Sequence, residues 1–264
     1  MLLAQISDLH VVAPGALLFD RIDTPDFLRR AVAHLNALDP RPDFVLMTGD
    51  LTDAGSLAEY DHLRALLGEL QIPWAVMPGN HDERANFRQA FADQPYLPRD
   101  GEFLHYTIEY LPLRLIALDT LIPGAAGGAL CRVRLDWLAA RLDEKPDQPT
   151  VVAMHHPPSS TGLVEMDAIK CDNGAALGAI VARHPQIERI ICGHVHRPIT
   201  VRWHGTVVTT VPGTAHQVAL DLRTGSPTAW IMEPPALHLH QWRPDLGLVT
   251  HQSYIGDHGP PTPY

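Results

Sequence analysis

Five short signatures in this chain combine carboxylate, amide and imidazole side chains, the groups that hold metal ions in proteins. In chain order they are Asp8-x-His10, Gly49-Asp50, Gly79-Asn80-His81-Asp82, His155-His156 and Gly193-His194-Val195-His196. Each one directly follows a short apolar run, which indicates the end of a buried strand. Open α/β sheets keep their ligand crevice at such strand ends, so the pattern predicts one polar site built from all five.

The residue types narrow the chemistry of that site. Asp, Asn and His without Cys are typical of Mn, Fe, Co or Zn. Two such ions lie roughly 3.5–4 Å apart and need a charged bridging ligand, for which the Asp50 carboxylate is the natural candidate. Such ions lower the pKa of a bound water from about 15.7 towards 7. Their excess positive charge would also hold a phosphate anion. From these ligands, the predicted cofactor is therefore a pair of divalent or trivalent metal ions.

Each signature by itself has an ordinary structural interpretation. A lone Asp-x-His is usually a surface turn, and Gly49-Asp50 is a common strand exit. Gly79-Asn80 suits a left-handed turn. Five coincidences at strand ends favour a metal site over five independent turns. The residues alone leave open which of His155 and His156 is a ligand and which packs beside it.

Strands and helices alternate through the first three-quarters of the chain. Near-continuous apolar strands between amphipathic helices predict a sheet that is covered on both faces. Thr24 is expected to cap the first helix, and Ser56 with Glu59 to form a capping box on the second. The predicted strands are 2–8, 44–49, 74–79, 150–155 and 188–193, with a hairpin over 105–111 and 113–119; the predicted helices are 24–38, 56–70, 84–91, 134–144 and 173–184.

After His196 the pattern contains strands only, over 200–213, 216–222, 235–242 and 247–255. This part is expected to supply the second sheet of a sandwich, an oligomerisation appendage, or both.

The bulk composition excludes several classes of protein. The formal net charge of −10 disfavours a protein that coats nucleic acid. Three cysteines without CxxC spacing argue against a disulfide framework and favour a reduced, cytoplasmic setting. A signal peptide is not expected, because cleavage would remove Asp8, and no apolar stretch is long enough for a membrane span.

The five signatures together resemble the calcineurin-like metallophosphoesterase superfamily. The blocks DLH, GDLTDAG, GNHD, MHHPP and GHVH carry this resemblance over residues 8–196. MDAIKCDNG (166–174) and VPGTAHQ (211–217) are similar to its branch of bacterial cyclic-nucleotide and glycerophosphodiester phosphodiesterases. The resemblance implies an α/β fold, a β-sandwich flanked by helices (αββα) with a strand-rich C-terminal extension. Residues 1–200 would form the catalytic core, and residues 201–264 would complete the sandwich, form an oligomer interface, or both.

The resemblance also implies a role for individual residues. Asp8, His10 and His196 would hold one metal ion, Asn80, His155 and His194 the other, and Asp50 would bridge them. His81 would be the catalytic residue beside the leaving group, donating a proton or stabilising phosphoryl oxygens. Asp82 would orient His81 or point into the following turn. Asn80, His81 and His216 are the candidate substrate-binding residues, with a purely structural role as the alternative for His216.

The function implied is hydrolysis of small phosphodiesters, either 3′,5′- or 2′,3′-cyclic nucleotides or glycerophosphodiesters, with in-line attack by metal-activated hydroxide. A phosphomonoesterase or nuclease using the same site is the alternative, and a non-catalytic interaction module is a third. Neither a long nucleic acid nor a membrane is an expected partner. A homo-oligomer, dimer or larger, is expected.

Overall fold

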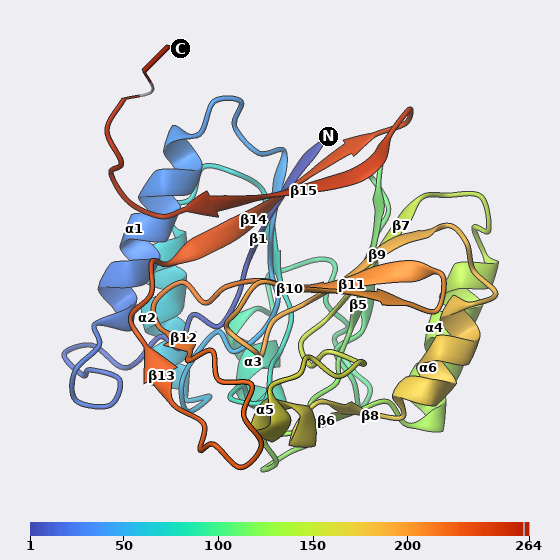
Figure 1. The fold of residues 1–264 in the computed structure, drawn as a ribbon, viewed down its shortest axis with the longest axis horizontal. Coiled ribbons are helices and arrows are strands. Elements are labelled where there is room, and N and C mark those ends of the chain that lie inside the picture. Colours follow the sequence, from blue (N-terminus) through green and yellow to red (C-terminus); the bar gives the residue numbers. More distant parts are fainter. Residues whose placement is uncertain (261, 264) are drawn as a thin grey trace.

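Two β-sheets stacked face to face form the centre of the molecule. The computed structural model describes residues 1–260, 262 and 263 of the chain. One sheet has the order β15-β14-β1-β2-β3 and the other the order β10-β11-β9-β7-β5-β4 (Figure 1). The first contains β1 (Leu2–Ile6), β2 (Phe44–Met47), β3 (Trp74–Val76), β14 (Ala236–Arg243) and β15 (Gly247–Tyr254). The second contains β4 (Tyr106–Ile108), β5 (Arg114–Leu118), β7 (Thr150–Met154), β9 (Ile187–Cys192), β10 (Ile199–Trp203) and β11 (Thr206–Thr210).

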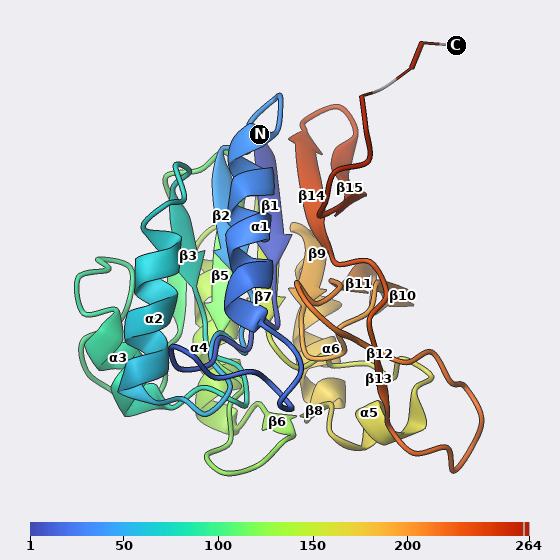
Figure 2. The ribbon, with the colours of Figure 1, turned by 90° about the vertical axis from the view of Figure 1, so that its left-hand side faces the viewer.

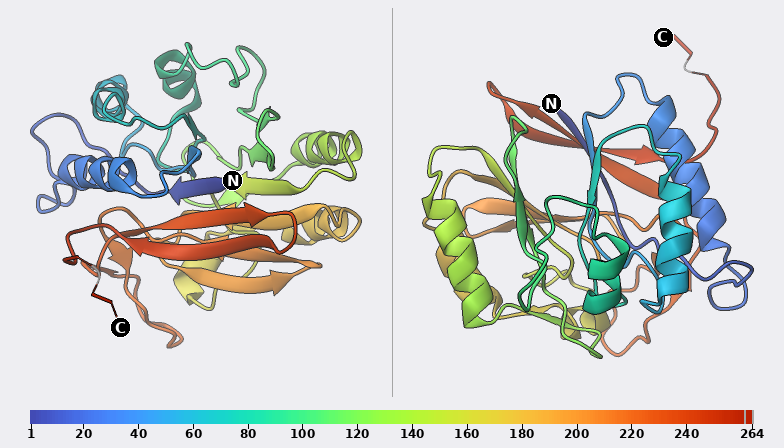
Figure 3. Two further views of the ribbon diagram at one scale, coloured as in Figure 1. Left: turned by 90° about the horizontal axis from the view of Figure 1, so that it is seen from above. Right: turned by 180° about the vertical axis from the view of Figure 1, so that it is seen from behind.

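Helices cover the outer faces of this sandwich, which confirms the αββα architecture expected from the sequence (Figures 2 and 3). The helices α1 (Thr24–Ala37), α2 (Leu57–Leu67) and α3 (Arg84–Ala90) pack with β1, β2 and β3 in the larger hydrophobic core. The helices α4 (Arg132–Asp143) and α6 (Gly174–Val181) pack against β5, β7 and β9 in a second core. Burial of these apolar faces is the main force that holds the layers together.

Helix capping follows the sequence in one helix and departs from it in another. Ser56 and Glu59 form the expected capping box on α2. The cap of α1 is Asp23 and not the predicted Thr24, because the Thr24 hydroxyl donates a hydrogen bond to the His10 carbonyl oxygen at 2.6 Å. The Asp23 carboxylate then accepts from the Asp26 backbone N–H. The hydrogen bond from Thr24 to His10 holds the start of α1 against the loop that carries His10.

The segment after His196 contributes strands to both sheets. β10 and β11 extend the six-stranded sheet, with β11 parallel to β9. β14 pairs antiparallel with β1, and β15 forms the edge of the five-stranded sheet. The predicted strand over 216–222 is only the two-residue β12 (Gln217–Val218), paired with β13 (Trp230–Ile231).

Several small elements that the sequence did not indicate lie at one end of the sandwich. They are the short helix α5 (Val164–Ala168) and the paired strands β6 (Gly128–Ala129) and β8 (Cys171–Asp172). Figure 1 shows them together with β12 and β13 at the end where β1 terminates. Within the described part of the chain, no helix is long and apolar enough to cross a membrane.

Candidate metal centre

The candidate ligands lie at the carboxyl ends of strands from both sheets. Asp8 and His10 follow β1, Asp50 follows β2, and Asn80 follows β3; His155 follows β7, and His194 and His196 follow β9. Five of them have left-handed backbone, with φ between 43° and 69°: Asp8, His10, Asp50, His194 and His196. Residues other than glycine rarely adopt this conformation, and it is concentrated at functional sites. The loops are therefore bent so that these side chains converge.

The first group of candidate ligands is formed by Asp8, His10 and His196. The Nε2 atoms of His10 and His196 lie 3.2 Å apart. His196 Nε2 lies 3.4 Å from Asp8 Oδ1, and His10 Nε2 lies 3.7 Å from Asp50 Oδ2. All three side chains are buried.

The second group is formed by Asn80, His155 and His194. Asn80 Oδ1 lies 3.2 Å from His155 Nε2 and 3.0 Å from His194 Nδ1. His155 Nε2 also lies 3.2 Å from Asp50 Oδ2. Because Asp50 Oδ2 approaches His10 of the first group and His155 of the second, this carboxylate lies between the two groups.

The unused ligand atoms of these groups fit metal ions. His155 Nδ1 contacts the Thr48 carbonyl oxygen at 2.8 Å, and His196 Nδ1 contacts the His216 carbonyl oxygen at 3.1 Å. Because a carbonyl oxygen can only accept, Nδ1 is the donor in both rings. This leaves Nε2, next to the carboxylates, as the atom that would bind a metal ion, which is how metal-binding imidazoles are held. Within the described residues, Asp8 Oδ2 and His194 Nε2 are buried without a hydrogen-bond partner. A cation is the group that the Asp8 oxygen lacks.

Two glycines let the loops approach one another closely enough to form this arrangement. A Cβ atom on Gly79 would lie 2.2 Å from Asp50 Oδ1, and one on Gly49 would lie 2.5 Å from His155 Nδ1. Both separations are shorter than any allowed contact. The glycines in the Gly-Asp and Gly-Asn signatures are therefore required by packing.

Burial and mutual attraction set the charges of the group. Burial raises the pKa of Asp8, and the neighbouring Asp50 carboxylate raises it further. Burial opposes charge on Asp50 as well, but the combined attraction of His155, His81 and His10 outweighs it and holds the pKa of Asp50 well below its usual range. Burial, followed by repulsion from other histidines, lowers the pKa values of His194 and His196 to about 3. These two imidazoles are therefore neutral at pH 7, as metal binding requires.

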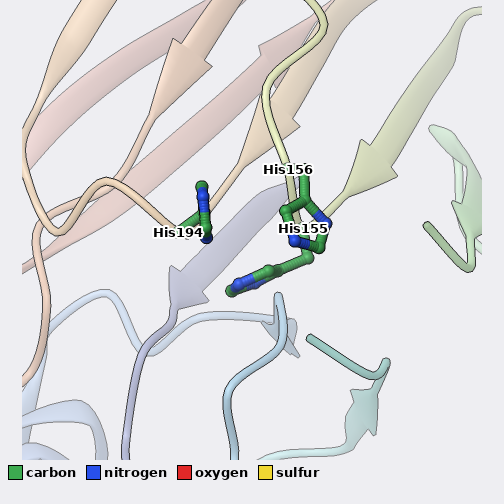
Figure 4. A group of neighbouring side chains, drawn as sticks. All are labelled: His155, His156 and His194. Atoms are coloured by element: carbon green, nitrogen blue, oxygen red, sulfur yellow. The ribbon is translucent and has the colours of Figure 1, made fainter. Parts of the chain in front are cut away.

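His155 and His156 differ in what their ring nitrogens contact. His156 Nδ1 lies 2.8 Å from Thr120 Oγ1, and its Nε2 lies 3.2 Å from the Ala126 carbonyl oxygen. Both nitrogens of His156 therefore have partners in the protein, whereas His155 Nε2 faces Asp50. Figure 4 shows the two rings beside His194. The contacts favour His155 as the ligand and give His156 the role of holding the 124–128 segment over the site.

His81 lies next to the candidate ligands without joining either group. Its ring meets the ring of His10 edge to face, with centroids 4.6 Å apart, and its Nδ1 contacts the Asp53 carbonyl oxygen at 2.7 Å. Asp82 does not orient it. Burial raises the pKa of Asp82 to about 6, and its carboxyl group accepts hydrogen bonds from Leu51 N–H, Gly79 N–H and the Tyr60 hydroxyl. Asp82 therefore points back towards Gly79, Leu51 and Tyr60, and neither expected orientation, towards His81 or into the following turn, is observed.

Asp53 is a residue of the site that the sequence analysis missed. Its Oδ1 lies 3.4 Å from His10 Nδ1 and 3.6 Å from His81 Nδ1. The Asp53 carboxylate thus lies next to the Nδ1 atoms of both imidazoles. Its place three residues after Asp50 in GDLTD is the one sequence signal that points to it.

A cavity of about 270 Å³ opens over the group. The candidate substrate-binding residues Asn80, His81 and His216 all line it. The His216 ring lies 4.6 Å from that of His196. Arg197, the residue after His196, is held elsewhere by hydrogen bonds to Glu233 and to the Val218 carbonyl oxygen.

A sandwich with acidic and imidazole side chains gathered at its strand ends is the arrangement of a metal-dependent hydrolase. Comparison with known proteins specifies the class. The family described as calcineurin-like phosphoesterase matches residues 1–198. A probable glycerophosphodiester phosphodiesterase, GpdQ, from Arcobacter nitrofigilis is 37% identical over 265 residues, covering 100% of this chain and 97% of that protein. A probable cyclic nucleotide phosphodiesterase from Rhodopseudomonas palustris is 37% identical over 234 residues, covering 87% and 84%.

Solved structures agree in fold. A dimetal phosphatase from Danio rerio has a TM-score of 0.64 at 16% identity, covering 97% of this chain and 99% of its own. The chain therefore belongs to the calcineurin-like phosphoesterase family.

Proposed function

We propose that this protein is a metal-dependent phosphodiesterase that hydrolyses small phosphodiesters. The observation that carries the proposal is the position of Asp50 between two groups of ligand atoms, with His81 beside them at a cavity. Asp8, His10 and His196 would hold one ion, and Asn80, His155 and His194 the other. Bound ions would supply Lewis acidity, which activates water and neutralises charge on the phosphoryl oxygens.

His81 is assigned the proton transfer to the departing ester oxygen. Its Nδ1–H donates to the Asp53 carbonyl oxygen, which leaves Nε2 as the nitrogen that exchanges a proton with substrate. The contact with the backbone also fixes the plane of the ring. Asn80 and His216 line the same cavity and are assigned to substrate binding.

The lining of the cavity favours a diester over a monoester. Among the residues that the structure describes, no Lys or Arg lines it. A phosphomonoester dianion carries one more charge than a diester and is usually held by such cations. The relatives named above support a cyclic nucleotide or a glycerophosphodiester as the substrate.

Chromogenic esters test the proposal. The purified chain, loaded separately with Mn, Co, Zn or Fe, should cleave bis-p-nitrophenyl phosphate faster than p-nitrophenyl phosphate, and a chelator should abolish turnover. His81→Ala should lose about 10²- to 10⁴-fold in kcat with unchanged metal content. His251→Ala, at an exposed position on β15, is the matched control and should keep full activity. Substoichiometric metal with no turnover in any loading would instead favour a non-catalytic interaction module.

The native metals, the cytoplasmic location and a dimeric or larger assembly remain parts of this proposal. Elemental analysis of protein purified without added metal addresses the first. Sedimentation equilibrium addresses the assembly, with a single-chain mass as the result that would exclude it.

A further inference from the structure

Two exposed aromatic side chains stand at the rim of the cavity. Phe19 is 54% exposed and Trp230 is 38% exposed, and both line the cavity. Their rings are nearly parallel, with an interplanar angle of 12° and centroids 5.8 Å apart. Large apolar groups are left in water at a cost, so an exposed aromatic pair at a site indicates a surface that binds something.

These two rings lie close to the candidate metal ligands, with the His216 ring between them and the ligands. The His216 ring lies 4.6 Å from that of His196, and the Phe19 ring lies 5.7 Å from that of His216. The Trp230 ring lies 5.8 Å from that of Phe19 and 6.5 Å from that of His216, so the three rings form a cluster beside His196. A ligand whose phosphate lies at the metal centre would therefore have its ester arm directed into this aromatic cluster of His216, Phe19 and Trp230.

The loop that carries Phe19 is built to hold it at the rim. Phe19 and Asp20 both have left-handed backbone, with φ of 53° and 55°. Leu18 and Ile22 exchange two backbone hydrogen bonds across this turn, and both side chains pack against Ala215 beneath it. Such a conformation persists only where the surroundings enforce it. Phe19 is therefore fixed in place.

Trp230 is held by a different part of the chain. It lies on β13, opposite Val218 of β12, and Val218 also lines the cavity. Met166 and Ile169, in and just after α5, add further apolar lining. The cavity is therefore polar at the metal centre and apolar along its walls. Its lining suits a ligand with one charged phosphate and one flat, uncharged arm.

We propose that Phe19 and Trp230 form a subsite that binds a planar heterocyclic arm of the substrate by stacking. The inference rests on the proposed function and sharpens it, because it favours phosphodiesters that carry a nucleobase over those with small hydrophilic arms. Stacking on aromatic side chains tolerates every base, since each has a π-face. The subsite therefore selects for a base without selecting which base.

A pair of substrates tests the subsite. The kcat/KM values are measured for 3′,5′-cAMP and for glycerophosphoethanolamine in the parent, Phe19→Ala and Trp230→Ala. Each variant should lose about 5- to 100-fold for cAMP through KM and less than about 2-fold for glycerophosphoethanolamine. Trp230→Phe should restore most of the loss. Tyr110→Ala, which removes an aromatic side chain 72% exposed outside the cavity, is the control and should change neither value.

Three results would overturn the subsite. Equal losses for both substrates would show a structural role, and no loss for either would show that the rings are idle. A change in oligomeric state by light scattering, with the substrate ratio unchanged, would make the rim a contact between copies of the chain.

Failure of the proposed function gives a different result, namely that the parent cleaves no diester. The subsite is then judged by equilibrium binding of adenosine 5′-monophosphate, which the parent should bind more tightly than Trp230→Ala does. Equal binding by the two proteins would overturn it.

Discussion

Two groups of buried histidines lie in this sandwich, and only one of them has the features of a site. His240 on β14 uses both ring nitrogens on protein partners, with Nδ1 2.8 Å from Thr250 Oγ1 and Nε2 3.1 Å from Gln5 Oε1. His155 uses Nδ1 on a backbone carbonyl oxygen and turns Nε2 towards Asp50 and Asn80. His240 is thus part of a structural hydrogen-bond network. His155 instead places Nε2 next to the oxygen atoms with which it would share a metal ion.

Charge alone does not separate the two groups. Burial lowers the pKa of His238, next to His240, to about 4, with repulsion from Arg189 adding to the shift. It lowers the pKa of His194 in the candidate centre to about 3. His194 and His238 are therefore both neutral at pH 7, although the candidate centre also contains His155, where burial is outweighed by its neighbours, chiefly Asp50, and the pKa is raised to about 9. What distinguishes the candidate centre is convergence on shared carboxylates, together with the left-handed backbone of its ligands.

Replacing Asp50 should have the largest effect. Asp50→Asn keeps the shape but removes the charge between the two groups of ligand atoms. Turnover of bis-p-nitrophenyl phosphate should fall by at least about 10³-fold, and elemental analysis should find fewer bound ions. Asp61→Asn, at an exposed position on α2, is the matched control. Full activity in Asp50→Asn would remove the distinction between the two histidine groups.

Replacing Asp53 should have a smaller effect on the same centre. Its carboxylate contacts the Nδ1 edges of His10 and His81, behind the atoms assigned to metal and substrate. Asp53→Asn should weaken metal affinity by about 10- to 100-fold, which is the usual result of removing such a supporting carboxylate. Metal titration followed by activity measures this. An unchanged affinity would mean that Asp53 serves only His81.

Replacing His240, in the histidine group outside the candidate centre, should lower the stability of the fold and leave activity unchanged. His240→Leu leaves Gln5 Oε1 buried without its partner, which costs about 1–3 kcal/mol in the free energy of unfolding. His240→Gln should cost less, because an amide can still donate. Metal content should not change in either variant, since Gln5 keeps its hydrogen bonds to Thr48 and Cys192. Urea unfolding and elemental analysis together check this prediction, and loss of metal from His240→Leu would contradict it.

The last prediction concerns pH, and its effect is absent at pH 7. The pKa of His238 is about 4 in the folded chain and about 6.5 in the unfolded chain, so the unfolded state binds more protons between these values. Its contribution is complete above pH 6.5 and is lost as the pH falls towards 4, up to about 3 kcal/mol. His238→Asn should therefore lose stability less steeply than the parent over this range. Parallel curves of unfolding free energy against pH would contradict the assignment.

Most of the fold follows from patterns visible in the sequence. The strands at 44–47 and 150–154 are recognisable as nearly unbroken apolar runs, because every residue in them is buried and both faces of each strand are covered. The short elements β6, β8, α5 and β13 escape such reasoning, because elements of two to five residues are too short to show a period. They form through tertiary contacts at one end of the sandwich.

The candidate site could be predicted in its residues but not in its geometry. The seven candidate ligands and His81 stand in contiguous signatures, which is why a resemblance could assign them. Asp53, Phe19 and Trp230 reach the same cavity from a turn, a strained loop and a two-residue strand. No local pattern links these three residues, because only the packing of the loops brings them together.

Diffraction from crystals grown with Mn²⁺, with anomalous data at the manganese edge, tests the central claim most directly. Two anomalous peaks are expected, one among Asp8, His10 and His196 and the other among Asn80, His155 and His194, with the Asp50 carboxylate contacting both. A single peak away from Asp50 would contradict the account. So would the absence of any peak among these side chains in a crystal that binds manganese at other positions.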